Sequence, residues 1–235
     1  MRLPDIIKNL EKLNSIGFLP TQRKGPTGIG HLLESMLGLD ETNIAIPDIG
    51  GRVELKATRK NVNSLITLFT FNRAVWKAKQ TEIIKKYGYV DDKGRQALYT
   101  TVNNKTPNNQ GFILISDPQK HLIVLKNIAE NENIAEWSTY VLAGKFMTKL
   151  DRLLLIFADN KTENNIELFH FNEAYLLENP TPEKFLVAFE NSKLMIDLRM
   201  YLKESGGVRN HGTGFRISEK NLSELYEKKE NWYNR

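Results

Sequence analysis

The sequence predicts a mixed α/β fold, in which a mixed sheet is flanked by helices. Strand-like segments of alternating or continuous apolar residues are interspersed with segments of helical periodicity. Hydrophobic residues make up 40% and charged residues 26% of the 235 positions, as in ordinary soluble globular proteins. There is no internal repeat and no low-complexity tract. A chain of this length can bury a substantial core as one domain or as two lobes.

The first elements expected are two helices separated by a basic loop. Residues 4–15 carry apolar side chains at helical spacing, and Gly17 would end that helix. A basic, glycine-rich loop follows over residues 21–30. The second helix is expected over residues 31–37, with Gly38 as its stop.

The rest of the chain alternates between strands and helices. An Asn-rich, turn-forming stretch over residues 102–110 predicts an exposed loop, near which a lobe boundary is expected. Strands are predicted over residues 44–46, 52–58, 64–71, 112–115, 121–124, 153–158, 166–171 and 194–201. Helices are predicted over residues 80–87, 183–189 and 218–230, the last closing the chain.

Composition excludes several classes of protein. With no cysteine, the chain forms neither disulfides nor thiolate zinc sites, which is typical of a reducing cytoplasm. Charges at Asp5, Lys8 and Glu11 leave no apolar segment for a signal peptide, and no apolar run is long enough for a membrane span. We therefore expect a cytoplasmic protein. A net charge of +5 and a pI near 9.2 favour polyanionic partners, although only modestly.

The most informative stretch is Pro47-Asp48 followed by Glu54-Leu55-Lys56, which has the form P-D-x5-E-x-K. Two neighbouring carboxylates repel each other unless a proton or a cation lies between them. Hard oxygen ligands of this kind suit Mg²⁺, which is commonly held by one or two carboxylates and substrate phosphate. The pattern thus predicts a divalent metal site beside a phosphodiester, with a lysine next to the attacking water.

The residues around the motif predict its local geometry. Apolar residues alternate with Glu54 and Lys56, which predicts a strand with one buried face and both charged side chains on the other. The pair Gly50-Gly51 predicts a tight turn or bulge that brings Asp48 back against Glu54. The alternative is a hairpin with a solvated salt bridge.

Acidic-x-Lys triplets also occur at Asp91-Asp92-Lys93 and at Glu227-Lys228-Lys229, so the triplet alone is weak evidence. Only the triplet at Glu54 has Pro-Asp a few residues upstream and an alternating apolar frame. We therefore place the candidate site there.

Two segments resemble the MvaI/BcnI family of MutH-like Type II restriction endonucleases. Residues 21–70 contain R-K-G-P-T-G-I-G, L-E-S-M-L-G, N-I-A-I-P-D, V-E-L-K and S-L-I-T-L-F-T, and are similar to the catalytic half of these enzymes. Residues 211–217, H-G-T-G-F-R-I, resemble their carboxy-terminal recognition element. The resemblance implies a PD-(D/E)xK fold in a single endonuclease unit over residues 1–235. Its approximate catalytic lobe would be 1–115 and its approximate recognition lobe 116–235.

The resemblance also implies roles for the motif residues. Asp48 and Glu54 would bind Mg²⁺, and Lys56 would position or activate water. Mn²⁺ is expected to substitute, and Ca²⁺ to support binding without cleavage. Glu34 matches a helical glutamate that supports the metal site, and its alternative is the polar edge of an amphipathic helix. The spacing from Asp48 to Glu54 is one residue longer than in the family, so the Gly50-Gly51 turn is a local extension.

DNA contacts are expected from two parts of the chain. The loop with Arg23 and Lys24 precedes a helix, where cations and backbone N–H groups can contact phosphate; the alternative is a flexible basic turn. Asp197 and Arg199 project from one face of a strand and match an acid–arginine pair of the family that contacts bases. Together they suit a G·C pair, and the alternative is an intrastrand salt bridge. The last candidates are Arg209, Asn210, His211 and Arg216.

Two of these residues, Arg209 and Asn210, depart from the family's pattern, which leaves the target sequence open. Thr70 stands where some members carry a histidine, and a strand threonine is the simpler interpretation. The remaining histidines, His31, His121 and His170, are interpreted as structural.

The resulting hypothesis is a Mg²⁺-dependent Type II restriction endonuclease acting on double-stranded DNA at a short site of the CCNGG kind. The resemblance implies a monomeric enzyme in a prokaryotic cytoplasm with access to the nucleoid, and a cognate DNA methyltransferase that protects host sites. One alternative is a MutH-like repair nickase with a mismatch-repair partner. Another is a DNA-binding module without catalysis, against which the retention of Asp48, Glu54 and Lys56 argues.

Overall fold

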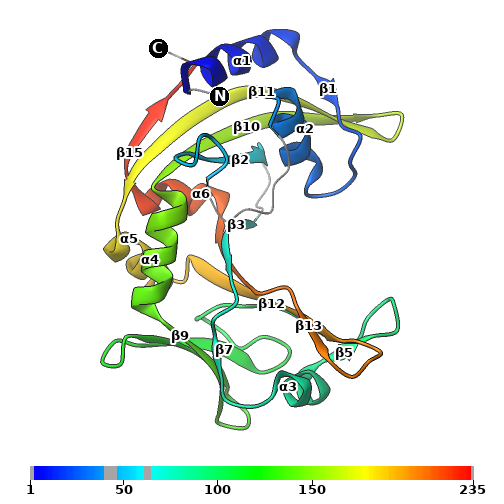
Figure 1. Ribbon diagram of the computed structural model, residues 1–235, viewed down its shortest axis with the longest axis vertical. Helices are drawn as coiled ribbons and strands as arrows, with labels where there is room; N and C mark the ends of the chain where they lie inside the picture. Colours follow the sequence, from blue (N-terminus) through cyan, green and yellow to red (C-terminus); the bar gives the residue numbers. More distant parts are fainter. Residues whose placement is uncertain (1–2, 40–46, 61–64, 234–235) are drawn as a thin grey trace. The chain divides into compact units, whose positions relative to one another are not determined.

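The structure is a computed structural model that describes residues 3–39, 47–60 and 65–233 (Figure 1). It divides into two compact units, each described here by itself. Unit 1 comprises Met1–Ser64, Met147–Thr181 and Leu222–Arg235, and unit 2 comprises Leu65–Phe146 and Pro182–Asn221. Both units combine segments that are distant in sequence, so neither is a consecutive half of the chain. The assignment of catalysis to residues 1–115 and recognition to residues 116–235 stays a prediction.

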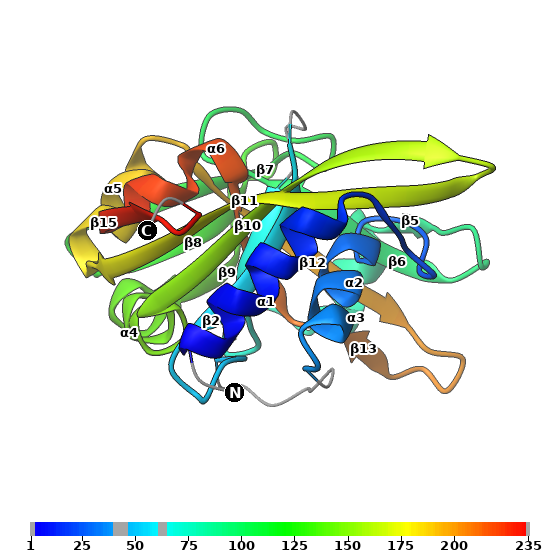
Figure 2. The ribbon, with the colours of Figure 1, turned by 90° about the horizontal axis from the view of Figure 1, so that it is seen from above.

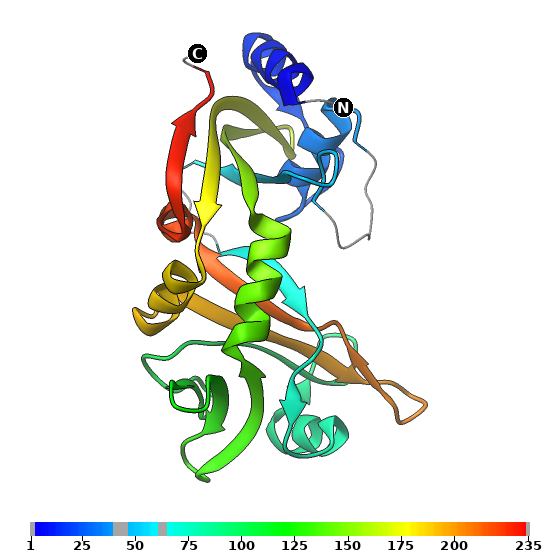
Figure 3. The ribbon, with the colours of Figure 1, turned by 60° about the vertical axis from the view of Figure 1, so that its left-hand side comes forward.

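Unit 1 is built around a mixed sheet. Its strands are β1 (Leu19–Pro20), β2 (Glu54–Arg59), β10 (Arg152–Glu163), β11 (Ile166–Pro180) and β15 (Tyr226–Asn231). They follow the order β1-β11-β10-β2, and β15 also pairs with β11, as Figure 3 shows. The β10–β11 pair is antiparallel, whereas β10 and β2 are parallel. Strand β2 therefore lies at an edge of the sheet, with one side free of a partner strand among the described residues.

Two helices bury their apolar faces against this sheet. They are α1 (Leu3–Ile16) and α2 (Gly28–Met36), which confirms the helices expected over residues 4–15 and 31–37. Figure 2 shows α1 lying across the long β10–β11 ribbon. The shared core includes Leu10 of α1, Leu33 of α2, Leu55 of β2 and Phe169 of β11, all buried. Helix α2 thereby holds its polar edge next to β2, where the candidate motif begins.

Unit 2 contains two sheets with helices beside them. The first has the order β3-β14-β12-β6-β5, with β13 also paired to β12, and the second has the order β4-β9-β8-β7. The strands of the first sheet are β3 (Leu65–Phe71), β5 (Tyr89–Val90), β6 (Gln96–Val102), β12 (Leu194–Leu202), β13 (Val208–Asn210) and β14 (Thr213–Ser218). Those of the second are β4 (Val75–Trp76), β7 (Phe112–Asp117), β8 (Leu122–Asn127) and β9 (Glu132–Ser138). The helices are α3 (Gln80–Tyr87), α5 (Pro182–Glu190) and α4 (Thr139–Leu150), which begins in unit 2 and ends in unit 1.

The predicted helix over residues 218–230 is wrong. The structure has a short helix α6 (Glu219–Leu222), a 3-10 turn (Ser223–Leu225) and then strand β15. The strand forms because its backbone pairs with β11, a partner that local periodicity does not reveal. The strand expected over residues 44–46 lies outside the described residues.

Helix α4 was not predicted. Its sequence starts with the β-branched residues Thr139 and Val141 and carries Gly144 in its interior, all of which weaken a helical signal. Its buried face nevertheless includes Leu142, Phe146 and Leu150. Tertiary packing therefore stabilises this helix despite its weak propensity. Within the described ranges, no helix is long and apolar enough to span a membrane.

Candidate functional site

A two-residue turn brings Asp48 to the start of β2. Gly50 and Gly51 have φ values of +57° and +69°, the left-handed region that glycine adopts without strain and that a type I′ turn requires. A backbone hydrogen bond of 3.0 Å closes the turn. Asp48 accepts through Oδ2 from the backbone N–H of Leu55 at 2.8 Å. The predicted turn is confirmed, and it places the Asp48 carboxylate beside the residue that follows Glu54.

The Glu54 carboxylate is buried, with an exposed fraction of only 2%. Lys56 donates from Nζ to Glu54 Oε1 at 2.7 Å, so the predicted side-by-side arrangement is confirmed. The prediction of a strand with only one buried face is wrong at Glu54, because residues from the end of α4 and the start of β15 lie near it. Lys149 of α4 lies 3.4 Å from the same Oε1. Burial, and after it the charge of Glu54, raises the pKa of Tyr226 in β15 well above its ordinary value.

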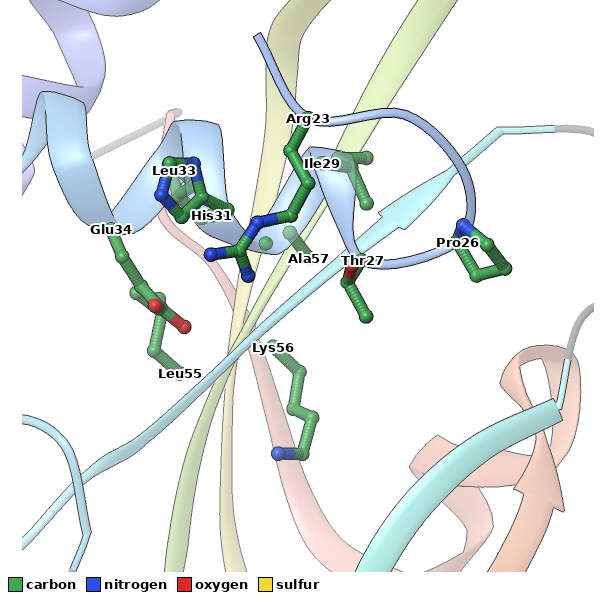
Figure 4. Close-up of a pocket in the computed structure, with 11 residues that line it drawn as sticks. Arg23, Pro26, Thr27, Ile29, His31, Leu33, Glu34, Leu55, Lys56 and Ala57 are labelled. Atoms are coloured by element: carbon green, nitrogen blue, oxygen red, sulfur yellow. The ribbon is translucent and has the colours of Figure 1, made fainter. Parts of the chain in front are cut away.

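A cavity of about 250 Å³ lies between β2 and α2, entirely within unit 1. Lys56 lines it, together with His31 and Glu34 of α2 and Arg23 of the preceding loop. Figure 4 shows the Arg23 guanidinium and the Glu34 carboxylate directed toward the strand that carries Lys56. The fold thus places Arg23, Glu34 and the strand segment with Lys56 around one cavity, although the Lys56 side chain extends away from the other two in Figure 4. Asp48 and Glu54 do not line this cavity.

Two anchors hold the basic loop in a defined shape. The Thr21 hydroxyl accepts from the Arg23 N–H at 3.2 Å and lies 3.3 Å from the carbonyl of the first residue of α2. The Arg59 guanidinium donates to the Gly25 carbonyl at 3.1 Å and forms an ion pair with β11. Lys24 remains exposed. The alternative of a flexible turn is less consistent with these contacts.

In unit 2, Asp197 forms an ion pair with Arg216 of the neighbouring strand and not with Arg199. Arg216 Nη1 donates to Asp197 Oδ2 at 2.6 Å, and its Nη2 donates to the Leu65 carbonyl at 2.7 Å. The Thr101 hydroxyl donates to Asp197 Oδ1 at 2.7 Å. Asp197 and Arg216 therefore link four neighbouring strands of the sheet, β3, β14, β12 and β6.

Arg199 is held at one side of its guanidinium. Its Nε donates to the Gly212 carbonyl at 3.2 Å, and its Nη2 donates to Thr70 Oγ1 at 2.8 Å. Its Nη1 has no acceptor within the described part of the chain. Gly214 lies directly beneath the guanidinium, because a Cβ at this position would contact it at 3.6 Å. Arg199 is therefore oriented by its neighbours, with donors left over for a ligand.

The remaining candidates are the last two residues of β13 and the residue that follows it. Asn210 accepts from the Gly212 N–H at 2.7 Å, which shapes the loop, and Arg209 is exposed. His211 is exposed as well. Partial desolvation, followed by the positive charges of Arg209, Arg199 and Arg95, lowers the pKa of His211 below 6.5. Positive charge is therefore concentrated around His211 in this part of unit 2.

The other acidic-x-Lys triplets have different surroundings. Asp91 is bound by the Arg95 guanidinium, which lowers the pKa of Asp91 to about 2. Glu227 is exposed on β15. Neither lines the cavity beside β2.

Comparison with known proteins identifies the fold. A family model of the MvaI/BcnI restriction endonuclease family matches residues 7–226. The chain belongs to this family.

A solved structure of the restriction endonuclease MvaI in complex with its cognate DNA substrate is similar, with a TM-score of 0.81 and 27% identity over 99% of both chains. A structure of MvaI in the absence of DNA has a TM-score of 0.57 and 26% identity, over 97% of this chain and 96% of that one. No curated protein matches the sequence. As a member of the MvaI/BcnI family, the chain is a restriction endonuclease, which confirms the nuclease class and the fold expected from the sequence.

Restriction endonucleases generally use a divalent metal, and the residues here fit such an ion. Glu54 Oε2 is buried and has no hydrogen-bond partner among the residues described. Buried polar atoms are normally paired, and a bound cation would provide the missing partner. Asp48 offers a second hard oxygen donor at the same end of β2. The described residues contain no group of three or more potential metal ligands. An ion bound here would therefore complete its shell with water or phosphate oxygens, as Mg²⁺ commonly does.

Two residues that were not among the sequence candidates lie near the candidate site of this MvaI/BcnI member. His31 was interpreted as structural but lines the same cavity as Glu34 and Lys56; its position three residues before Glu34 on one helix was the available signal. Lys149 approaches Glu54 from a helix far along the chain, and no local pattern points to it.

Proposed function

We propose that this chain is a Type II restriction endonuclease that uses Mg²⁺ to hydrolyse double-stranded DNA at a short, G·C-flanked site of the CCNGG kind. The observation that carries the proposal is the buried Glu54, which is paired with Lys56 and left with one unpartnered oxygen, while Asp48 is bound to the backbone of the following residue, Leu55. The solved MvaI structure that resembles the chain is a complex with cognate DNA, which supports duplex DNA as the substrate.

The proposed chemistry assigns each residue of unit 1 a task. Asp48 and Glu54 would hold a divalent ion, which would supply Lewis acidity at the scissile phosphate. Lys56 donates to the phosphate or orients the attacking water. Glu34 approaches the same cavity and supports the site electrostatically. The water oxygen would bond to phosphorus and release a proton to solvent. The phosphorus–oxygen bond to one backbone oxygen would break, and that oxygen would take up a proton to become a hydroxyl.

Arg23 and Lys24 are proposed to contact backbone phosphates. Arg23 lines the cavity with Lys56, whereas Lys24 is exposed at the tip of the anchored loop. Phosphate contacts fix the position of a protein on DNA without reading its sequence. The loop would therefore position the backbone against the cavity.

Sequence readout is proposed for the residues of unit 2. Arg199, with its free Nη1 donors, suits the O6 and N7 acceptors of guanine, and Asp197 can accept from cytosine N4 while it keeps its protein partners. Arg209, Asn210, His211 and Arg216 complete the proposed DNA-contacting set. We further propose that the enzyme acts as a monomer in the prokaryotic cytoplasm and that a cognate methyltransferase protects host DNA.

A plasmid assay tests the proposal. Purified protein with Mg²⁺ should convert plasmid DNA into discrete fragments whose sequenced ends share one short site. Lys56→Ala should lose cleavage by at least about 100-fold while retaining DNA binding in Ca²⁺. Lys8→Ala, on the exposed side of α1, serves as a matched control and should cleave normally. Normal turnover by Lys56→Ala contradicts the site. A persistent nicked circle supports the repair nickase, and specific binding with no cleavage by the unaltered protein supports the non-catalytic module.

A further inference from the structure

The two oxygens of the Glu54 carboxylate have different surroundings. Two ammonium groups, Lys56 at 2.7 Å and Lys149 at 3.4 Å, converge on Oε1, whereas the buried Oε2 has none among the described residues. A buried charge is costly unless it is paired, and an unpartnered buried oxygen is costly as well. The arrangement therefore leaves one oxygen of a buried carboxylate available for a further cation.

Lys149 is held in place by the packing of its helix end. It lies in the last turn of α4, and the next residue, Leu150, is fully buried. The hydroxyl of the buried Tyr226 donates to the Leu150 carbonyl at 3.0 Å, which ties the helix end to β15. A cation is also favourable at a helix carboxyl end. The Lys149 ammonium is thus directed toward Glu54 by a fixed backbone.

We infer that Lys149 is a positioning residue of the proposed metal site. By attracting Oε1, it orients the Glu54 carboxylate so that Oε2 is the oxygen left for the divalent ion. Its charge also stabilises the buried carboxylate when no ion is bound. Lys56 remains free to interact with phosphate, because Glu54 does not depend on it alone. This inference rests on the proposed function.

The inference predicts a specific coupling between Lys149 and the metal. Without Lys149, Glu54 keeps only one cationic partner in the metal-free protein, which lowers stability. A bound divalent ion would then replace the missing charge. The increase in melting temperature on adding metal should therefore be larger in a variant without Lys149 than in the unaltered protein. If Lys149 only packed against its neighbours, the increase would be the same in both proteins.

Thermal unfolding of the full chain without DNA, with and without Mn²⁺, tests the inference. Lys149→Met should lower the melting temperature by about 3–6 °C in the absence of metal, and Mn²⁺ should recover most of this loss. Lys149→Arg keeps the charge and should behave nearly as the unaltered protein does. Lys145→Met, one turn earlier on α4, is the matched control and should show the same Mn²⁺ response as the unaltered protein. In the Glu54→Gln background, Lys149→Met should have little further effect.

Three outcomes would overturn the inference. An Mn²⁺ shift in Lys149→Met that is equal to or smaller than that of the unaltered protein contradicts the inferred role of Lys149 but leaves the metal site intact. An undiminished effect of Lys149→Met in the Glu54→Gln background shows that Lys149 acts elsewhere. A complete absence of Mn²⁺ stabilisation in the unaltered protein removes the metal site of the proposed function, and the role of Lys149 with it. DNA cleavage is not needed for any of these measurements.

Discussion

Substitution of Gly28 by alanine should distort the basic loop without removing any charge. Gly28 is the first residue of α2, and a Cβ at this position would lie 2.3 Å from the backbone carbonyl oxygen of Arg23. Real Cβ atoms do not approach an oxygen this closely, so the loop backbone must move. The movement would strain the contacts of the Thr21 hydroxyl with Arg23 and Gly28.

The magnitude follows from the contacts at risk. The loop stands to lose the 3.2 Å backbone hydrogen bond from Gly28 to Gly25 and the 3.3 Å contact with Thr21, worth roughly 1 kcal/mol each. Displacing the loop adds strain of a similar size. Alanine gains up to about 1 kcal/mol over glycine in a helix, and less at a first position. The net effect on the free energy of unfolding should be a loss of about 1–3 kcal/mol.

Gly30→Ala is the matched control on the same helix. A Cβ at Gly30 meets nothing within 4 Å, so this substitution should be neutral or stabilise by up to about 1 kcal/mol. Urea unfolding followed by tryptophan fluorescence measures both variants, since Trp232 is buried in the core of unit 1. Gly28→Ala should also weaken DNA binding, because Arg23 and Lys24 move with the loop. Equal stability of the two variants, or a more stable Gly28→Ala protein, would refute the steric argument.

Two further predictions concern unit 2. Arg199→Lys should relax discrimination at one base pair by about 1–3 kcal/mol, because lysine lacks the planar fork that contacts Thr70 and Gly212. Competition binding with single-base variants of the DNA site measures this discrimination. An equal loss of affinity for every sequence would make Arg199 a phosphate contact. The pKa of His211 is lowered in the folded chain, so the unfolded chain binds a proton more readily. The free energy of unfolding should therefore be highest above pH 6.5 and should decrease as the pH falls below 6.5 toward the folded pKa. Desolvation is the largest cause of the shift, but the ring is exposed, so the loss of stability should be small. Melting temperatures measured from pH 5 to pH 7.5 should depend less on pH in His211→Gln than in the unaltered protein. Identical pH profiles of the two proteins would contradict this prediction.

Several elements could be predicted because their signals are local. The helices α1 and α3 and the strand β12 follow from periodicities contained in a few turns or residues. The turn at Gly50 and Gly51 follows from the left-handed conformation that glycine permits. Other elements depend on distant partners. Strand β15 forms on β11, and helix α4 forms by burying its apolar face against the rest of the fold.

The same distinction applies to the candidate site. Glu54 and Lys56 were predicted to lie side by side because a strand has a period of two. The burial of Glu54 was not predicted, since the segments that cover it come from α4 and β15. In unit 2, the spacing of Asp197 and Arg199 placed them on one face. Their actual partners could not be read from spacing, because cross-strand neighbours depend on strand order.

By itself the sequence determined the family, the acidic and basic residues available for phosphodiester chemistry, and the turn that returns Asp48 to β2. Only the tertiary structure decided which charges meet: Lys149 at Glu54, Arg216 at Asp197 and Arg59 at Glu167. The physical reason is the range of the interactions. Backbone conformation and side-chain periodicity are set by neighbours within a few residues, whereas the pairing of a charge depends on which distant segments packing brings beside it.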